Sequence, residues 1–339
     1  MSETKEVFVE KLILHILDNC LGLPVLSEEE HPFDDDINEF MIKHIDRVFE
    51  DVNLKQAYFE DENNIVKKLC DNILEDNNVF IYCSKKFGEL LYDTMLKNPD
   101  IPSADLVCSL FSRDGVRYLG LFIFTYKTSY IHYIEELETK RINKVIKQKT
   151  ALPNENQKVE ECVIINLEDY SMLLKEKKYE IDGEKQYYLS KKILKSEYIM
   201  SDKEKMDIIN KASKRVIKEH YDGDITKIAE IKNIIVESVE DSNTVDIEEI
   251  KGKVFDNNPE MQNIYVEEIE KSGLTDKTIT VSDNVSKKIA KKQRLVTDDG
   301  IEIKLPVSYL TRKDKVEFLN NQDGTVSILL KNIRDIKDK

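Results

Sequence analysis

Apolar positions in the first hundred residues follow first the spacing of a strand and then the spacing of helices. Residues 1–26 alternate and cluster their apolar side chains before a turn at Gly22 and Pro24, which predicts a leading strand. Beyond Asp34-Asp35-Asp36, apolar residues recur at intervals of three and four up to Phe49, so they describe one helix face. The aspartates suit the N-terminus of that helix. The same spacing predicts further helices over 65–74 and 80–95.

The pattern then changes to strands. Residues 104–111 and 116–127 flank the turn Arg113-Asp114-Gly115, which predicts a β-hairpin. The run from Leu121 to Phe124 is continuously apolar, so this strand is expected to be covered on both faces. Strands are also predicted over 162–167, 172–181 and 186–189.

A helix is predicted from Ser201 onward, because Ser201 and Glu204 form a capping-box pattern ahead of helically spaced apolar residues. Helices follow around 225–239, 247–255 and 259–269, and strands return over 301–305, 316–319 and 325–330. The predicted fold class is therefore α+β. It divides into a mixed α/β-sheet domain over 1–198, a helical region over 199–274 and a C-terminal basic helix and small β unit over 275–339.

Composition narrows the class of protein. With 40% hydrophobic residues, the 339-residue chain has enough material for folded cores. Ten glycines leave little for phosphate-cradling loops, and five cysteines without a CxxC pair indicate reduced thiols in a cytosolic protein. The N-terminus is not a signal peptide, and the longest apolar run, Leu119 to Phe124, is too short to cross a membrane. We expect no membrane partner.

The net charge of −15 is unevenly distributed. Residues 1–100 hold 23 acidic and 10 basic residues, a net charge of −13, whereas residues 101–339 hold 43 and 41, a net charge of −2. The last 89 residues are slightly positive, with 15 acidic and 17 basic residues. A local positive surface is therefore compatible with an acidic protein.

A series of segments carries a family resemblance, in the order LILHILDNCLGLPVLSEEE, IPSADLVCSLF, GVRYLGLFIFTYKTSYIH, IKQKTALPNENQKVEECVIINLEDYSMLLKEKKYEIDGEK, SDKEKMDIINKASKRVIKEHY, GIEIKLP and DGTVSILLKNI. Together they resemble the bacterial 37-kDa nucleoid-associated protein family (YejK/NdpA-like) over nearly the whole chain. The resemblance implies a cytoplasmic protein of the nucleoid that binds DNA and is not an enzyme. It supplies no DNA-contacting motif, so contact residues must come from this sequence.

The first candidate is the acid-free stretch Asn284 to Thr297, with Lys287, Lys288, Lys291, Lys292 and Arg294. In a helix, residues 287 and 291, and 288 and 292, are neighbours one turn apart, so their ammonium groups would share a face. Such a face neutralises phosphates without reading sequence. The alternative is an ordinary solvated amphipathic helix.

The second candidate is the stretch Lys140 to Lys149, which has no acid and contains Lys140, Arg141, Lys144, Lys147 and Lys149. It follows the aromatic residues Tyr126, Tyr130, His132 and Tyr133, and rings beside basic residues can stack on the bases of nucleic acid. The alternative is half-buried tyrosines beside a solvated strand edge. A third group (Lys211, Lys214, Arg215 and Lys218) is interpreted as an ordinary exposed helix face.

Signals for an enzyme are weak. The sequence has no GxxxxGK[ST], GxSxG or HExxH motif, and we expect no cofactor, no metal and no catalytic residue. His132 with Glu135 and Glu136 is a poor metal site. The triplet Glu302-Ile303-Lys304 could belong to a metal-dependent nuclease, but an exposed strand face with alternating charges is the favoured interpretation.

The functional prediction is non-enzymatic, largely sequence-independent DNA binding through local basic faces. The alternative is an adaptor whose acidic N-terminal region, with Glu28-Glu29-Glu30 and Asp34-Asp35-Asp36, docks on a nucleoid or DNA-topology protein. A metal-dependent nuclease is the third and least favoured reading. The sequence does not fix the oligomeric state.

Overall fold

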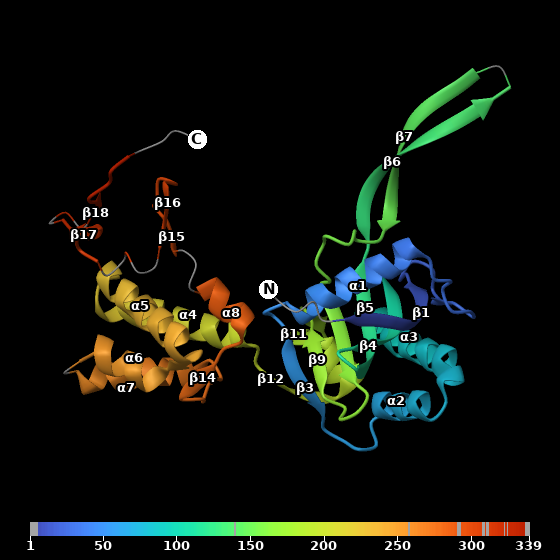
Figure 1. The fold of residues 1–339 in the computed structure, drawn as a ribbon, viewed down its shortest axis with the longest axis horizontal. Coiled ribbons are helices and arrows are strands. Elements are labelled where there is room, and N and C mark those ends of the chain that lie inside the picture. The colour runs from blue at the N-terminus through green and yellow to red at the C-terminus, as the bar shows by residue number, and fades with distance from the viewer. Residues whose placement is uncertain are drawn as a thin grey trace. The chain divides into compact units, whose positions relative to one another are not determined.

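A computed structural model of the chain divides into two compact units, residues 1–199 and residues 200–339 (Figure 1). The further boundary expected between residues 274 and 275 stays a prediction. The structure describes residues 6–138, 140–256, 258–289, 293–306, 309, 312–321, 323 and 325–335.

The first unit is built on one eight-stranded sheet in which every pair of neighbouring strands is antiparallel. In spatial order its strands are β12 (Ser196–Ile199), β3 (Lys55–Phe59), β9 (Met172–Lys175), β8 (Glu161–Asn166), β5 (Val116–Thr125), β4 (Ala104–Arg113), β1 (Val7–Leu17) and β2 (Val25–Leu26).

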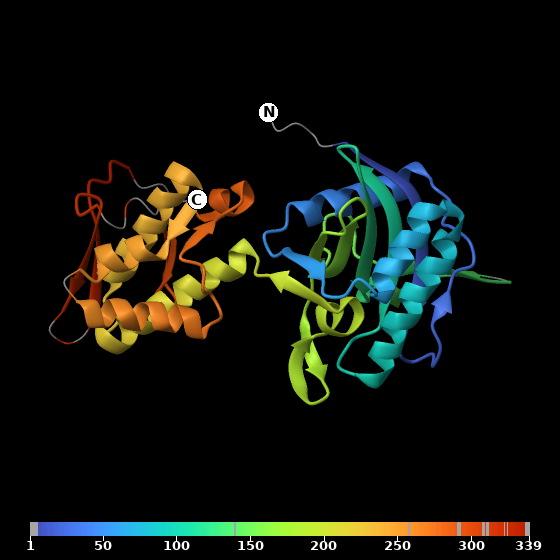
Figure 2. The ribbon, with the colours of Figure 1, turned by 90° about the horizontal axis from the view of Figure 1, so that it is seen from below.

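Helices cover both faces of this sheet (Figure 2). Helix α1 (Asp35–Phe49) lies on one face, where its buried residues form a core with Val107, Phe122 and Phe124. Helices α2 (Ile65–Glu75) and α3 (Phe80–Lys97), joined by the 3-10 turn η1 (Asn77–Val79), lie on the other face with the alternate strand residues. Because side chains alternate across a strand, both faces of β4 and β5 are apolar, which explains the continuous apolar run from Leu121 to Phe124.

Local signals in the sequence account for the boundaries of these elements. The Asp34 carboxylate accepts the amide hydrogen of Ile37 at 2.8 Å and caps α1, as the aspartate run predicted. Asp114 and Gly115, between β4 and β5, have φ angles of 52° and 82°, which a two-residue hairpin turn requires. The prediction of a strand covered on both faces is confirmed.

Two hairpins of the first unit lie outside the main sheet. The smaller pairs β10 (Lys178–Ile181) with β11 (Glu184–Tyr187), which leads into the π-helical turn η2 (Leu189–Leu194). The larger pairs β6 (Lys127–Leu137) with β7 (Lys140–Ala151) and projects away from the sheet as a long two-stranded ribbon (Figure 1). We call this ribbon the arm.

The second unit is helical at its start and ends in small hairpins. Its elements are α4 (Asp202–His220), α5 (Ile225–Ser242), β13 (Thr244–Asp246), α6 (Ile247–Val254), α7 (Pro259–Lys271), β14 (Thr278–Thr280), α8 (Asp283–Ile289), β15 (Gln293–Val296), β16 (Glu302–Leu305), β17 (Val316–Asn320) and β18 (Val326–Leu330). The hairpins β15–β16 and β17–β18 contribute Leu305 and Val316 to a core with Ala229 and Val236 of α5.

The α+β class is confirmed, with the sheet domain first, helices in the middle and small hairpins last. One element was predicted wrongly: a single helix over 284–297 is replaced by α8, which ends at Ile289, and by strand β15. The partner of β15 is β16, beyond a turn at Asp298-Asp299-Gly300, and a helical spacing does not reveal that pairing. Among the described residues, no helix is long and apolar enough for a membrane span.

Candidate nucleic-acid interface

The arm brings the second candidate stretch and most of its aromatic neighbours onto one ribbon. In its antiparallel register Tyr130 lies opposite Lys147, His132 opposite Val145 and Tyr133 opposite Lys144. Paired residues share a face of the ribbon and successive pairs alternate between faces. The predicted group therefore does not form one surface but divides between two.

One of these two surfaces, the basic–aromatic face, carries the side chains suited to nucleic acid. Its members are Tyr130, His132, Ile134, Glu136, Arg141, Asn143, Val145 and Lys147. Tyr130 and Val145 are 69% and 77% exposed, so none of the residues that the structure describes covers this face. Lys149 lies where the register shifts between Lys127 and Ser129, at an irregularity that re-aims side chains near the base of the arm.

Carboxylates near the tip neutralise part of the arm's positive charge. Arg141 pairs with Glu136 at 2.9 Å and Lys144 pairs with Glu135 at 2.7 Å. Within the part of the chain that the structure describes, Lys147 and Lys149 have no carboxylate partner. The phosphate-binding capacity of the arm is thus greatest in its half nearest the base.

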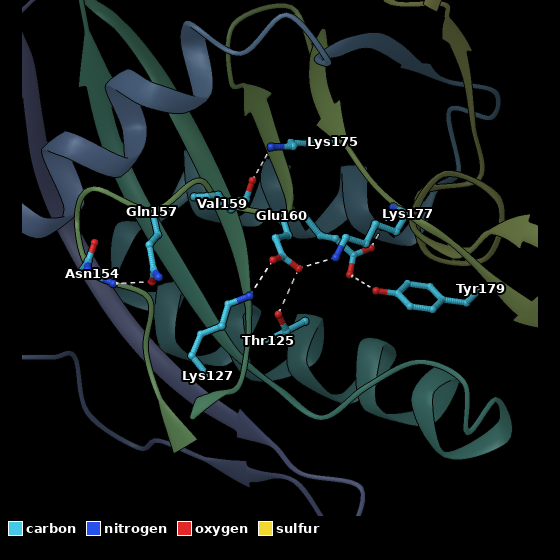
Figure 3. A network of polar contacts seen from close by, with 10 residues as sticks. Thr125, Lys127, Asn154, Gln157, Val159, Glu160, Lys175, Lys177 and Tyr179 are labelled. Carbon is cyan, nitrogen blue, oxygen red and sulfur yellow. Dashed lines mark hydrogen bonds and ion pairs between the residues drawn. The ribbon is translucent and has the colours of Figure 1, made fainter. Parts of the chain in front are cut away.

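The base of the arm is held by a network of charged groups (Figure 3). The Lys127 ammonium, at the start of β6, donates to Glu160 Oε1 at 2.7 Å, and Lys177 donates to the other oxygen of the same carboxylate. These two bonds hold the pKa of Glu160 at about 2 despite its partial burial. Since Lys127 is already paired, it contributes to anchoring the arm rather than to binding a phosphate.

Tyr126 also belongs to the base. Its hydroxyl bonds the Asp105 carboxyl, and burial raises the pKa of Asp105 to about 6. Tyr126 was grouped by sequence with the exposed tyrosines, but it anchors the junction between β5 and β6. Residues 129–137 are rich in tyrosine and isoleucine, which are typical of strands, and this signal could have predicted a strand there. Sequence reasoning missed the arm itself.

The other basic candidates belong to the second unit. Lys287 and Lys288 lie on α8 and Arg294 on β15, while Lys291 and Lys292 lie outside the described residues. The proposed one-turn spacing across 287–292 therefore has no described helix to support it beyond Ile289.

The third group lies on α4, as expected for an exposed helix face. There Arg215 pairs with Glu219 and Glu268, which leaves it less available to a phosphate.

One buried histidine–serine contact has the composition of a catalytic pair but the wrong proton arrangement. His15 Nδ1 accepts the amide hydrogen of Ser27, so Nε2 carries the ring proton and donates to Ser84 Oγ at 3.1 Å. The Ser84 hydroxyl in turn donates to the Ile81 carbonyl. His15 therefore cannot accept the serine proton and has a structural role.

The described residues include no group of three His, Cys, Asp or Glu side chains that could hold a metal ion. His132 and Glu135 lie on opposite faces of the arm. Glu302 and Lys304 share a face of β16, as the strand spacing predicted, and lie opposite Val296 and Arg294 of β15.

In a comparison with known protein families, the model of the family described as "NA37: Nucleoid-associated protein YejK" matches residues 13–337. No curated protein matches the chain.

Proposed function

The chain belongs to the nucleoid-associated protein YejK family, and from this premise we propose that it binds DNA directly, without catalysis, through the basic–aromatic face of the arm. The observation that carries the proposal is the exposure of Tyr130, His132 and Lys147 together on a ribbon whose base is anchored.

The arm has dimensions that suit a groove of duplex DNA. The major groove is about 12 Å wide and admits a two-stranded β-ribbon. On such a ribbon, Lys147 and Lys149 would neutralise phosphates and release counterions, while Tyr130 contributes apolar contacts. These contacts read the backbone rather than base edges, so the binding would be largely independent of sequence.

The acidity of the whole protein sets a limit on this binding. Residues 1–100 carry a net charge of −13, which repels a polyanion, so attraction has to come from a part that stands clear of them. The projecting arm, with six basic and three acidic residues over 127–151, meets that requirement. The segment from Lys287 to Arg294 is a second proposed contact on sequence grounds.

The test is fluorescence anisotropy of a labelled duplex over a salt series. We expect Lys147→Glu/Lys149→Glu to lower the affinity at least tenfold at low salt and to make the salt slope shallower by roughly 2, at about 0.9 per phosphate contact. The matched control, Lys211→Glu/Lys218→Glu, makes the same change of charge on exposed residues of α4 and should have little effect. A parallel variant reverses Lys287, Lys288, Lys291 and Lys292 to test the second contact.

If the parent protein fails to bind duplex DNA even at low salt, the second candidate function is that of an adaptor that docks on another protein. Residues 18–36, between β1 and the first turn of α1, hold seven acidic and no Lys or Arg residues, and Leu23 and Phe33 are exposed among them. This surface would suit a basic DNA-handling protein, so the chain would then be an adaptor. Replacing the acids of 27–36 with neutral residues should abolish partner recovery in a pull-down, and unchanged recovery would rule the adaptor out.

A further inference from the structure

The centre of the basic–aromatic face is apolar rather than charged. Val145 lies directly opposite His132, and Tyr130 and Ile134 lie two residues to either side of that histidine on β6. Both are therefore diagonal neighbours of Val145 on the same face. We call Tyr130, Ile134 and Val145 the apolar patch. All three side chains are exposed, and Val145 has the highest exposed fraction of the large hydrophobic residues that the structure describes.

The apolar patch is placed to meet base edges when the arm lies in a groove. Lys147 lies opposite Tyr130 on this face, and its long side chain can reach phosphates at the wall of the groove. The short Val145 side chain stays at the centre of the ribbon, over the floor of the groove. The patch extends over the five residues from Tyr130 to Ile134, roughly 13 Å along β6, which corresponds to about four base pairs.

The major groove offers one apolar group to such a patch, the C5-methyl group of thymine. A G·C pair presents only hydrogen-bond acceptors and a donor there, whereas an A·T pair adds this methyl group. Against G·C pairs, Val145 and Ile134 would take polar base edges out of water without giving them a hydrogen bond. Against thymine, apolar surface is buried on both partners.

Asn143 adds a polar contact that selects the same base pair. It lies opposite Ile134 on the basic–aromatic face and is exposed. Its amide forms no hydrogen bond with any of the described residues. An asparagine amide matches adenine in the major groove, because it donates to N7 and accepts from the N6 amino group. Adenine is the partner of thymine, so Asn143 and the apolar patch favour the same pair.

Given the proposed function, on which this inference rests, we propose that the arm prefers A·T-rich duplex DNA, with Val145 and Ile134 packed against thymine methyl groups and Asn143 paired with adenine. The preference is one of base composition and needs no fixed order of bases. It therefore acts in addition to the phosphate contacts of Lys147 and Lys149, which are the same at every sequence.

The experiment is fluorescence anisotropy of the full chain with four labelled duplexes of equal length. They are an alternating A·T duplex, the same duplex with uracil for thymine, an alternating G·C duplex, and the same duplex with 5-methylcytosine for cytosine. Uracil removes only the C5-methyl group, and 5-methylcytosine adds a methyl group at the same ring position of a G·C pair. The comparison of thymine with uracil uses the parent protein, so it does not depend on the folding of a variant.

The test variant is Ile134→Ser/Val145→Ser, which removes the two aliphatic side chains of the apolar patch. The matched control is Ile131→Ser/Ile146→Ser, which removes two aliphatic side chains of the same two strands from the opposite face. Asn143→Ala is a second test variant, and circular dichroism checks the folding of each.

We expect uracil to weaken binding of the parent about fivefold, because one fully buried methyl group is worth a factor of about four and two are partly buried here. 5-Methylcytosine should strengthen binding to the G·C duplex by a similar factor. The ratio between thymine and uracil duplexes should fall below about twofold in Ile134→Ser/Val145→Ser and stay unchanged in the control. Asn143→Ala should lower the preference for A·T over G·C. Lys147→Glu/Lys149→Glu should instead weaken binding to all four duplexes equally, since phosphates are common to them.

Equal affinity of the parent for the thymine and uracil duplexes would overturn the inference and leave the proposed DNA binding intact. An equal loss of the ratio in the test and control variants would also overturn it, since the apolar patch would then not be the reader. A parent that binds none of the four duplexes would refute the proposed function and the base preference together.

Discussion

His44 is fully buried on α1, with its ring centroid 4.4 Å from that of Phe40 and 5.1 Å from that of Phe124. Burial, followed by the nearby Arg47 charge, lowers its pKa to about 4. In the unfolded chain the pKa of His44 is near 6.5, so as the pH falls the imidazole is protonated in the unfolded state before it is protonated in the folded state. Stability is therefore lost as the pH falls from about 6.5 to 4. Between pH 7.5 and pH 5, the free energy of unfolding measured by urea denaturation should fall by about 2 kcal/mol less in His44→Phe than in the parent. Equal losses would contradict a buried neutral His44.

Glu161 makes stability depend on pH in the opposite direction, because burial raises its pKa instead of lowering it. It is almost completely buried, and burial raises its pKa to about 7, although Tyr179 Oη and the Lys177 amide both donate to its carboxylate. Because the folded protein favours the protonated form, stability is lost as the pH rises from about 4.5 through 7. Glu161→Gln keeps the carbonyl acceptor without the charge. It should be stabilised relative to the parent by about 3 kcal/mol more at pH 8 than at pH 4.5. A pH-independent difference in urea denaturation would refute this.

At the scale of the element, the arm depends on its anchoring at the base. Glu160 bonds Lys127 of β6 and Lys177 ahead of β10, so one carboxylate joins the arm to the sheet domain (Figure 3). Glu160→Gln removes the negative charge that both ammonium groups share. We expect faster amide hydrogen exchange in β6 and β7, with unchanged protection in β4 and β5. The control is Glu168→Gln, an exposed carboxylate that follows β8. If all strands were equally affected, the network would stabilise the whole sheet rather than the arm.

The elements that sequence predicted well are those in which the apolar pattern matches burial. In α1 and in β4 and β5 the apolar positions face a core, so the spacing of side chains gave both the element and its buried face. The arm breaks that correspondence, because Tyr130, Ile134 and Val145 are apolar or aromatic and yet exposed. The division of its basic residues between two faces depended on the register, which a single strand pattern does not specify.

The segment after α8 was predicted wrongly for a related reason. Val285 and Ile289 have the i, i+4 spacing of a helix, and this correctly indicates α8. Residues 293–296 instead form a strand because 302–305 lie beside them, in register from Gln293↔Leu305 to Val296↔Glu302. Pairing between segments overrides local propensity, and it cannot be read from either segment alone.

At the scale of the whole molecule, the arm can be removed without cutting the sheet. Lys127 and Ala151 are register partners at its base, so an Asn-Gly turn in place of residues 128–150 should close the hairpin and keep the Lys127–Glu160 bond. We expect the shortened protein to unfold within a few degrees of the parent, because the two cores on the sheet do not include the removed residues.

Loss of the arm should also change DNA binding in a measurable way. If Lys147 and Lys149 each neutralise one phosphate, the log–log salt slope should become shallower by roughly 2 per chain, at about 0.9 for each contact. The measurement is anisotropy of a labelled duplex over a salt series, with the parent and the shortened protein compared. If the shortened protein keeps the full slope, the DNA contact does not lie on the arm, and the segment from Lys287 to Arg294 becomes the remaining candidate.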